Sequence, residues 1–269
     1  MNPHSLFWTH SQGRIHLLRW GDGPQLWIAL HGYGDRAEQF APLAAALGPG
    51  RTLYAVDLPQ HGRTEWAEAY TPDELQQLVA WILQREERST CRLVGFSFGG
   101  RLALATWPRL GARVAELYLL APDGLATRSS RGLTWLPLSW RAWIIARLRE
   151  PAWLLNLLAG LGRWGLVPAF PRRFLEYQLC DPQRRARLFH TWRIIDAFAL
   201  GKAPVRRRIR AAVHPVWLVF GTADTIVPPD LGRYLATGAE RAELLLLEAK
   251  HHQLVAAFAR WCTEGEGPE

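Results

Sequence analysis

Short apolar runs alternate with helix-length amphipathic stretches along most of this chain, and that alternation limits the possible folds more than any other feature. The apolar runs are rich in Val, Leu, Ile and aromatic residues, as buried parallel strands are. The pattern predicts strands at 14–19, 26–30, 52–56, 92–96, 117–120, 216–220 and 244–247. It predicts helices at 37–47, 72–88, 98–107, 229–237 and 252–262. Such alternation is typical of an α/β domain in which helices cover both faces of a mostly parallel sheet.

The alternation fails between residues 124 and 212, where Leu, Trp and Arg recur at helical spacing without a strand-like run. We predict that 124–212 is a helical insertion, a lid or cap, in one core formed by 1–123 and 213–269. A chain of 269 residues is long enough for one such core with an insertion. The lid would lie over the carboxyl ends of the strands, where open α/β sheets bind their ligands.

Positive charge is concentrated in the predicted lid. Its 16 Arg and one Lys stand against two Glu and two Asp, so the lid carries +13 and the rest of the chain −5 of a total of +8. Six of the 14 Trp also lie there, which suggests three interpretations. The lid could line a hydrophobic acyl pocket, contact an anionic membrane, or bind an anionic group of the substrate through arginine. Nucleic acid is not expected as a partner, because no recognition motif accompanies the charge.

The N-terminal segment and the cysteines indicate the cellular setting. The first 20 residues contain His, Arg and polar residues where a signal peptide has an uninterrupted apolar run. No segment offers the roughly 18 uncharged apolar residues of a membrane span. Cys91, Cys180 and Cys262 match neither a disulfide framework nor the spacing of metal ligands. We therefore predict a cytoplasmic protein with reduced thiols, no metal and no organic cofactor.

The segment Gly-Phe-Ser-Phe-Gly at 95–99 places Ser97 between a predicted strand and a predicted helix. A Gly-x-Ser-x-Gly segment in that context forms a sharp turn that exposes the serine hydroxyl above the sheet. The glycines allow the strand and helix backbones to pass closely. Ser97 is therefore the candidate nucleophile.

A serine hydroxyl needs an imidazole as base and a carboxylate to orient that imidazole. Asp224 follows the strand predicted at 216–220, and His251 follows the strand predicted at 244–247. Two alternatives remain open at this stage. His252 could be the base instead of His251, and Asp123, after the strand at 117–120, could be the acid instead of Asp224.

Two backbone amides are candidates for stabilising a negatively charged oxygen. Tyr33 lies in His-Gly-Tyr-Gly at 31–34, directly after a strand, and Phe98 directly follows Ser97. Removing one such donor lowers the rate by about a hundredfold or more. The segment 57–64, Asp-Leu-Pro-Gln-His-Gly-Arg-Thr, is predicted to be a structural turn without a catalytic role.

These features in this order, from His31-Gly32 through 57–64 and 95–99 to Asp224 and His251, resemble the α/β-hydrolase superfamily. The resemblance covers the chain apart from the lid. It implies an eight-stranded, mostly parallel sheet, a helical cap, and a triad in the order serine, acid, histidine. Two positions depart from the family pattern: Lys250 stands where glycine often precedes the histidine, and Gln60 stands where a small residue or glycine is common.

The resemblance also implies the chemistry. The expected function is a carboxylesterase-like serine hydrolase that cleaves an ester, thioester or lactone through an acyl-enzyme on Ser97. The same triad could cleave a carbon–carbon bond or perform other lyase or transferase chemistry, because the lid chooses the substrate. A non-catalytic, ligand-binding member of the fold is the alternative from a different class.

Overall fold

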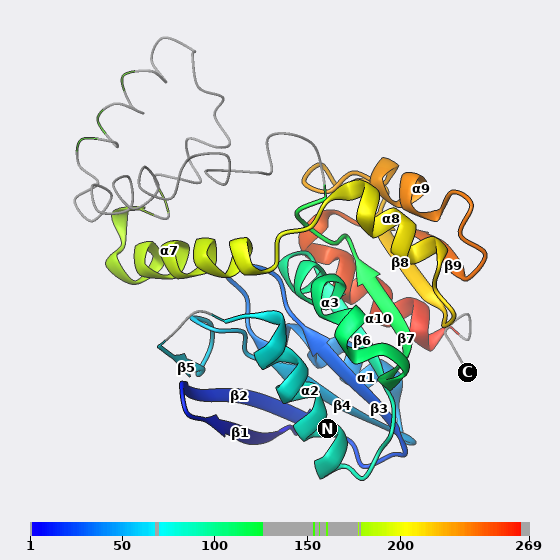
Figure 1. The fold of residues 1–269 in the computed structure, drawn as a ribbon, viewed down its shortest axis with the longest axis horizontal. Helices are drawn as coiled ribbons and strands as arrows, with labels where there is room; N and C mark the ends of the chain where they lie inside the picture. Colours follow the sequence, from blue (N-terminus) through cyan, green and yellow to red (C-terminus); the bar gives the residue numbers. More distant parts are fainter. Residues whose placement is uncertain are drawn as a thin grey trace. The chain divides into compact units, whose positions relative to one another are not determined.

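A twisted sheet forms the core of the unit made of residues 1–130 and 197–269 (Figure 1). The computed structural model describes residues 2–67, 70–125, 153, 156, 160, 177 and 179–264. Within these residues the sheet has nine strands: β1 (His4–His10), β2 (Gly13–Trp20), β3 (Gln25–Leu30), β4 (Arg51–Val56), β5 (Glu65–Trp66), β6 (Cys91–Phe96), β7 (Val114–Leu120), β8 (Val216–Gly221) and β9 (Ala242–Leu247). Eight of them follow the order β1-β2-β4-β3-β6-β7-β8-β9, and β5 pairs with β2 outside this path. The predicted eight-stranded α/β sheet is thus confirmed, with one short strand added.

The pairing of the strands explains why the sequences of most of them are continuous apolar runs. From β4 to β9 every neighbouring pair on this path is parallel, whereas β2 pairs antiparallel with β1, β4 and β5. In β3 and β4 every residue except the first is buried, as expected for strands covered on both faces. Parallel pairing also brings the carboxyl ends of these strands to one edge, where Leu30 lies opposite Gly95.

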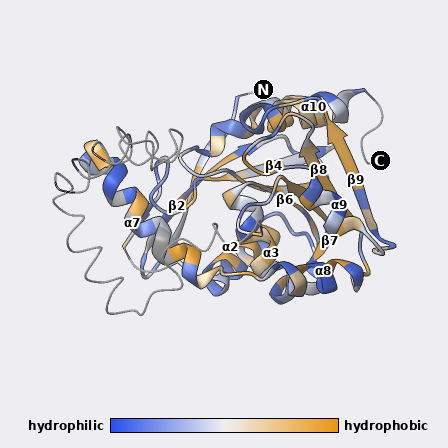
Figure 2. Cartoon of the chain, turned by 90° about the horizontal axis from the view of Figure 1, so that it is seen from above, coloured by the Kyte–Doolittle hydropathy of each residue, from blue (hydrophilic) through white to orange (hydrophobic). Residues whose placement is uncertain are grey.

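Helices cover the two faces of the sheet: η1 (Ala37–Phe40), α1 (Ala41–Leu47), α2 (Pro72–Arg85), α3 (Phe98–Leu110), α8 (Lys202–Arg210), α9 (Asp230–Ala236), η4 (His251–Gln253) and α10 (Leu254–Thr263). Figure 2 shows α10 on one face and α2, α3 and α8 on the other. Helix α1 packs against α10, and α2 packs against α3. This three-layer arrangement is the one that the alternation in sequence predicts.

The ends of α2 show how local sequence sets a boundary. Thr71 caps its start, accepting from the Asp73 amide at 3.2 Å, while the Glu74 carboxylate accepts from the Thr71 amide at 2.8 Å. The helix was predicted to continue to 88 but ends at Arg85. The helix cannot continue through Glu87, because the φ of this residue is 53°, a value outside the range of a right-handed helix.

The sequence did not predict two of the strands, β1 and β5. In β1 most residues are exposed or half-buried, since it is an edge strand of the sheet. Ser, Thr and His residues can therefore occupy it, and they interrupt the apolar run that a buried strand would show. Strand β5 has only two residues, too few for any pattern.

The chain divides into two compact units, 1–130 with 197–269, and 131–196. The second unit falls inside the predicted lid and includes most of α7 (Pro182–Ala197). Most of the lid, including the Trp-rich segment 135–145, lies outside the described residues. Helix α8, placed in the lid by the sequence, groups with the first unit. No helix in the described part of the chain is both long enough and apolar enough to cross a membrane.

Candidate active site

Ser97 occupies the turn between β6 and α3. Its φ of 50° lies in the left-handed region, which non-glycine residues seldom adopt. The turn is held by the Ser97 amide, which donates to the Leu120 carbonyl at 2.8 Å, and by the Asp123 amide, which donates to the Ser97 carbonyl at 3.0 Å. A strained residue fixed by its surroundings at the end of a strand is the arrangement that the sequence predicts for a nucleophile.

The glycines around Ser97 are required by close backbone contacts. A Cβ on Gly95 would lie 2.6 Å from the Cα of Gly100, and one on Gly99 would lie 2.1 Å from the Leu30 carbonyl oxygen. These contacts are between backbones, so side-chain rotation cannot relieve them. The two glycines flanking the serine therefore follow from the packing of α3 on β3 and β6.

Gly99→Ala is expected to destabilise the protein by about 3 kcal/mol, since an added methyl group would force α3 away from β3. The free energy of unfolding from urea titration measures this. Equal stability of Gly99→Ala and the unmodified protein would contradict the packing described for the turn.

His251 joins the nucleophile candidate to a carboxylate. Its Nε2 lies 3.0 Å from the Ser97 Oγ, and its Nδ1 lies 2.6 Å from Oδ2 of Asp224. A carboxylate only accepts, so the proton of a neutral imidazole is on Nδ1 and Nε2 accepts from the serine hydroxyl. Asp224 follows β8 and His251 begins η4 just after β9, so the ends of two neighbouring strands place both groups beside Ser97.

The Asp224 carboxylate is buried and held by several donors. Its Oδ1 accepts from the amides of Ile226 at 2.8 Å and Val227 at 2.9 Å. Burial acts to raise the pKa of Asp224, but the hydrogen bonds from His251 and these two amides outweigh it, and the pKa lies below its ordinary value. The carboxylate therefore stays ionised and orients the imidazole.

The residues of the two alternatives that the sequence left open have different surroundings in the structure. Asp123 forms an ion pair with Arg101 on α3, 2.5 Å from Oδ1 to Nη2, and its side chain is 33% exposed. His252 is exposed, whereas its neighbour His251 carries both contacts to the predicted site residues. The geometry thus brings together Ser97, Asp224 and His251.

Asp224→Asn is expected to lower kcat by about 10⁴-fold, because an amide can leave the imidazole in the wrong tautomer. The matched variant Asp123→Asn should retain most of the activity. Hydrolysis of an activated ester measures both, with the folded fraction of each variant determined by circular dichroism. A large loss in Asp123→Asn with little loss in Asp224→Asn would reverse the assignment of the acid.

The two predicted amide donors belong to segments that lie close to Ser97. Phe98 is its neighbour in the chain, and a Cβ on Gly32, next to Tyr33, would lie 3.6 Å from the Cβ of Ser97. The loop carrying Tyr33 is tied to the start of α3 by the Gly99 amide, which donates to the His31 carbonyl at 3.0 Å. Both predicted donors therefore lie in segments that are next to the serine and joined to each other by a backbone hydrogen bond.

Two histidines near this loop have side-chain contacts that the sequence did not predict. His31 is buried, and its Nε2 accepts from the Leu58 amide at 3.0 Å. His61 is also buried, and its Nε2 accepts from the Gly34 amide at 3.0 Å. These two hydrogen bonds join the loop after β3 to the segment 57–64. Within this segment, Gln60 has a φ of 67°. A left-handed φ is the physical reason that glycine suits this position.

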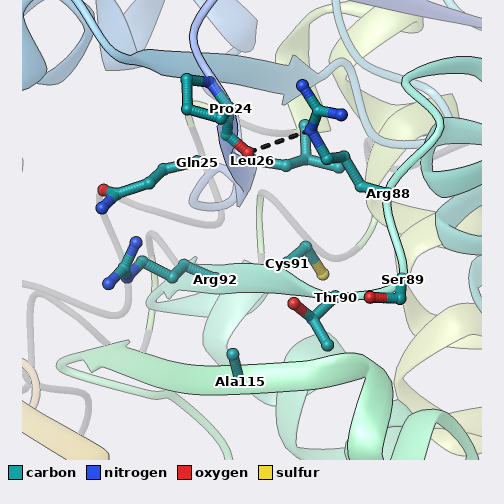
Figure 3. A pocket seen from close by; sticks show the side chains of 9 residues that line it. All are labelled: Pro24, Gln25, Leu26, Arg88, Ser89, Thr90, Cys91, Arg92 and Ala115. Carbon is teal, nitrogen blue, oxygen red and sulfur yellow. Dashed lines mark hydrogen bonds between the residues drawn. The ribbon is translucent and has the colours of Figure 1, made fainter.

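A separate hollow of about 270 Å³ lies at the amino ends of β3 and β6 (Figure 3). Arg88 lines one edge of it and donates to the Pro24 carbonyl at 3.0 Å. Ser97 lies at the opposite, carboxyl end of β6, so this hollow is not part of the candidate site. Among the described residues, no cluster of His, Cys, Asp or Glu could hold a metal ion.

Known proteins resemble this chain in sequence and in fold. Residues 27–260 match the model of the alpha/beta hydrolase family. A curated relative from Pseudomonas putida, the dihydrolipoyllysine-residue acetyltransferase component of an acetoin cleaving system, is 27% identical over 251 residues, covering 87% of this chain and 62% of its own length. A pimeloyl-[acyl-carrier protein] methyl ester esterase from Nitrosospira multiformis is 25% identical, covering 86% and 89%. The chain therefore spans less than two thirds of the Pseudomonas protein but most of the esterase.

A solved structure of a membrane phospholipase A superimposes with a TM-score of 0.69 at 16% identity, covering 98% of this chain and 85% of that one. At this identity the likeness concerns the fold alone. The family match extends over most of the sequence and includes the segments that carry Ser97, Asp224 and His251. This chain belongs to the alpha/beta hydrolase family.

Proposed function

We propose that the protein is a serine hydrolase that cleaves a carboxylic ester or a related acyl bond through an acyl-enzyme on Ser97. One observation carries the proposal: the unbroken chain of hydrogen bonds from Ser97 through His251 to Asp224. Nucleophile and base are within hydrogen-bond reach, and the base is oriented by a third group, as covalent catalysis by serine requires.

In the first half of the reaction, the Ser97 Oγ attacks the acyl carbon while its proton passes to the Nε2 of His251. The Asp224 carboxylate stabilises the imidazolium that forms. The amides of Tyr33 and Phe98 donate to the oxygen that becomes negative. His251 then gives the proton to the leaving alcohol or thiol, and the acyl group remains on Ser97.

In the second half, water replaces the alcohol. His251 takes a proton from the water molecule, the resulting hydroxide attacks the acyl carbon, and the proton returns to Ser97. The carboxylic acid leaves and the free serine is restored. The triad needs no cofactor for either half.

The relatives' names and the predicted lid support a proposal for the substrate class. Curated relatives are named esterases and a lipase, and one is named for a methyl ester on acyl-carrier protein. Ester hydrolysis is therefore the reaction that we propose for this chain. We propose that the basic, Trp-rich segment 124–212 selects among esters by the length and charge of the acyl group.

A series of p-nitrophenyl esters, from acetate to laurate, tests the proposal. We expect release of p-nitrophenol above the spontaneous rate, with a maximum of kcat/KM at one range of acyl lengths. Folded protein that hydrolyses no member of the series would contradict the proposed esterase activity. A flat profile would contradict the role given to 124–212 but not that given to Ser97.

A further inference from the structure

A second chain of serine, histidine and aspartate lies elsewhere in the sheet. The Oγ of Ser5 on β1 is 2.9 Å from Nε2 of His16 on β2, and Nδ1 of His16 is 2.7 Å from Oδ2 of Asp57, just after β4. These distances match those between Ser97, His251 and Asp224 within about 0.1 Å. The second chain shares no residue with the first.

The His16–Asp57 pair is rigid and almost fully buried, both side chains being 1% exposed. Asp57 accepts from two further donors, the amides of Ala37 at 2.7 Å and Arg63 at 2.8 Å. Asp224 accepts from two backbone amides in the same way. Because a carboxylate only accepts, a neutral His16 carries its proton on Nδ1 and presents the Nε2 lone pair to Ser5.

The backbone also fixes this imidazole. The His16 amide donates to the Thr64 Oγ1 at 2.9 Å, and the His16 carbonyl accepts from the Asp57 amide at 2.9 Å. The Thr64 hydroxyl in turn donates to the Asp57 carbonyl at 2.5 Å. The base is thus positioned before any reactant arrives, which is the condition for efficient proton transfer.

Ser5 itself is exposed, so a reagent can reach its hydroxyl from solvent. Its Oγ also accepts from Nη1 of Arg63 at 3.0 Å. The guanidinium stabilises negative charge on this oxygen and favours loss of the serine proton to His16. A histidine and aspartate that only tied β2 to β4 would need neither the exposed hydroxyl nor the cation beside it.

We propose that Ser5 is a second nucleophilic serine, a site of covalent acylation by small activated esters. The Oγ of Ser5 forms a bond to the acyl carbon, and the bond from that carbon to the leaving oxygen breaks. The serine proton passes to Nε2 of His16 and from there to the leaving alkoxide. The products are O-acyl-Ser5 and the free alcohol.

Ser5 acylation is slower than reaction at Ser97. Ser5 lies within strand β1 rather than at a turn before a helix, so the backbone amides of such a turn do not face its reacting group. Loss of oxyanion donors lowers rates by about 10²- to 10³-fold each, and Arg63 replaces them only in part. The reaction at Ser5 is accordingly a single acylation rather than turnover.

The test uses the full-length Ser97→Ala protein, in which the first site cannot react. It is incubated with p-nitrophenyl acetate and digested, and the acetylated peptides are identified by mass spectrometry. We expect an acetyl group on Ser5 and none on Ser11, an exposed serine six residues away whose hydroxyl makes no hydrogen bond to a histidine among the described residues. The adduct should vanish in Ser97→Ala/Ser5→Ala, and Arg63→Gln should slow its formation about tenfold.

Two results would overturn the proposal. The first is the absence of acetylation at Ser5 after prolonged incubation. The second is acetylation of Ser5 and Ser11 at equal rates, which would mean that His16 and Arg63 confer no reactivity. Because Ser97 is absent in every arm, neither result bears on the proposed esterase activity.

Discussion

Ser97→Ala is expected to lower kcat by about 10⁶-fold, because removal of the nucleophile leaves only binding and oxyanion stabilisation. KM should change far less, since the methyl side chain keeps the shape of the site. The hydrolysis rate of the best p-nitrophenyl ester, measured with and without enzyme, gives both quantities.

The Ser97→Ala variant is also expected to remain folded. In the unmodified protein the Ser97 hydroxyl contacts His251, but the turn is held by backbone hydrogen bonds that alanine retains. An unchanged urea midpoint would show that the loss is chemical. Retention of more than about a hundredth of the activity by folded Ser97→Ala would exclude this serine as the nucleophile.

His251→Ala should be as damaging, with kcat lowered by about 10⁶-fold, because the serine hydroxyl then has no base. The neighbouring variant His252→Ala is the control. Its side chain is exposed, so its removal should leave the rate nearly unchanged. Steady-state kinetics of the two variants on the same ester decides between adjacent histidines, and a severe loss in His252→Ala alone would reassign the base.

The sequence predicted the central strands well because burial on both faces leaves a continuous apolar run. Strands β3 and β6 are examples, and their lengths follow from the runs themselves. Strand β1 was missed for the opposite reason. An edge strand needs no such run, and its hydrogen bonds to β2 depend on tertiary structure.

The sequence could predict those residues of the candidate site that directly follow a strand. Ser97 was predicted from the strand before it and the helix after it. Asp224 was predicted from its place after β8, which is two strands from β6 in the sheet. Adjacent residues such as His251 and His252 cannot be separated by position. Only the direction of each side chain, set by η4, distinguishes them.

Contacts between segments that are far apart in the chain could not be predicted from the sequence. Asp123 and Arg101 are 22 residues apart, and nothing in either segment indicates their ion pair. The contact between His16 and Asp57 spans 41 residues. The segment 57–64 was predicted to be a structural turn, and the sequence gives no sign that its aspartate orients a histidine on β2.

The proposed function rests on Ser97 being the reactive nucleophile of this hydrolase. Peptide mapping after brief exposure of the full-length protein to a fluorophosphonate probe tests this claim. We predict one adduct per molecule, on the peptide that contains Ser97, and a strongly reduced rate of labelling in His251→Ala. Folded protein that hydrolyses esters yet carries no adduct on Ser97 would contradict the claim.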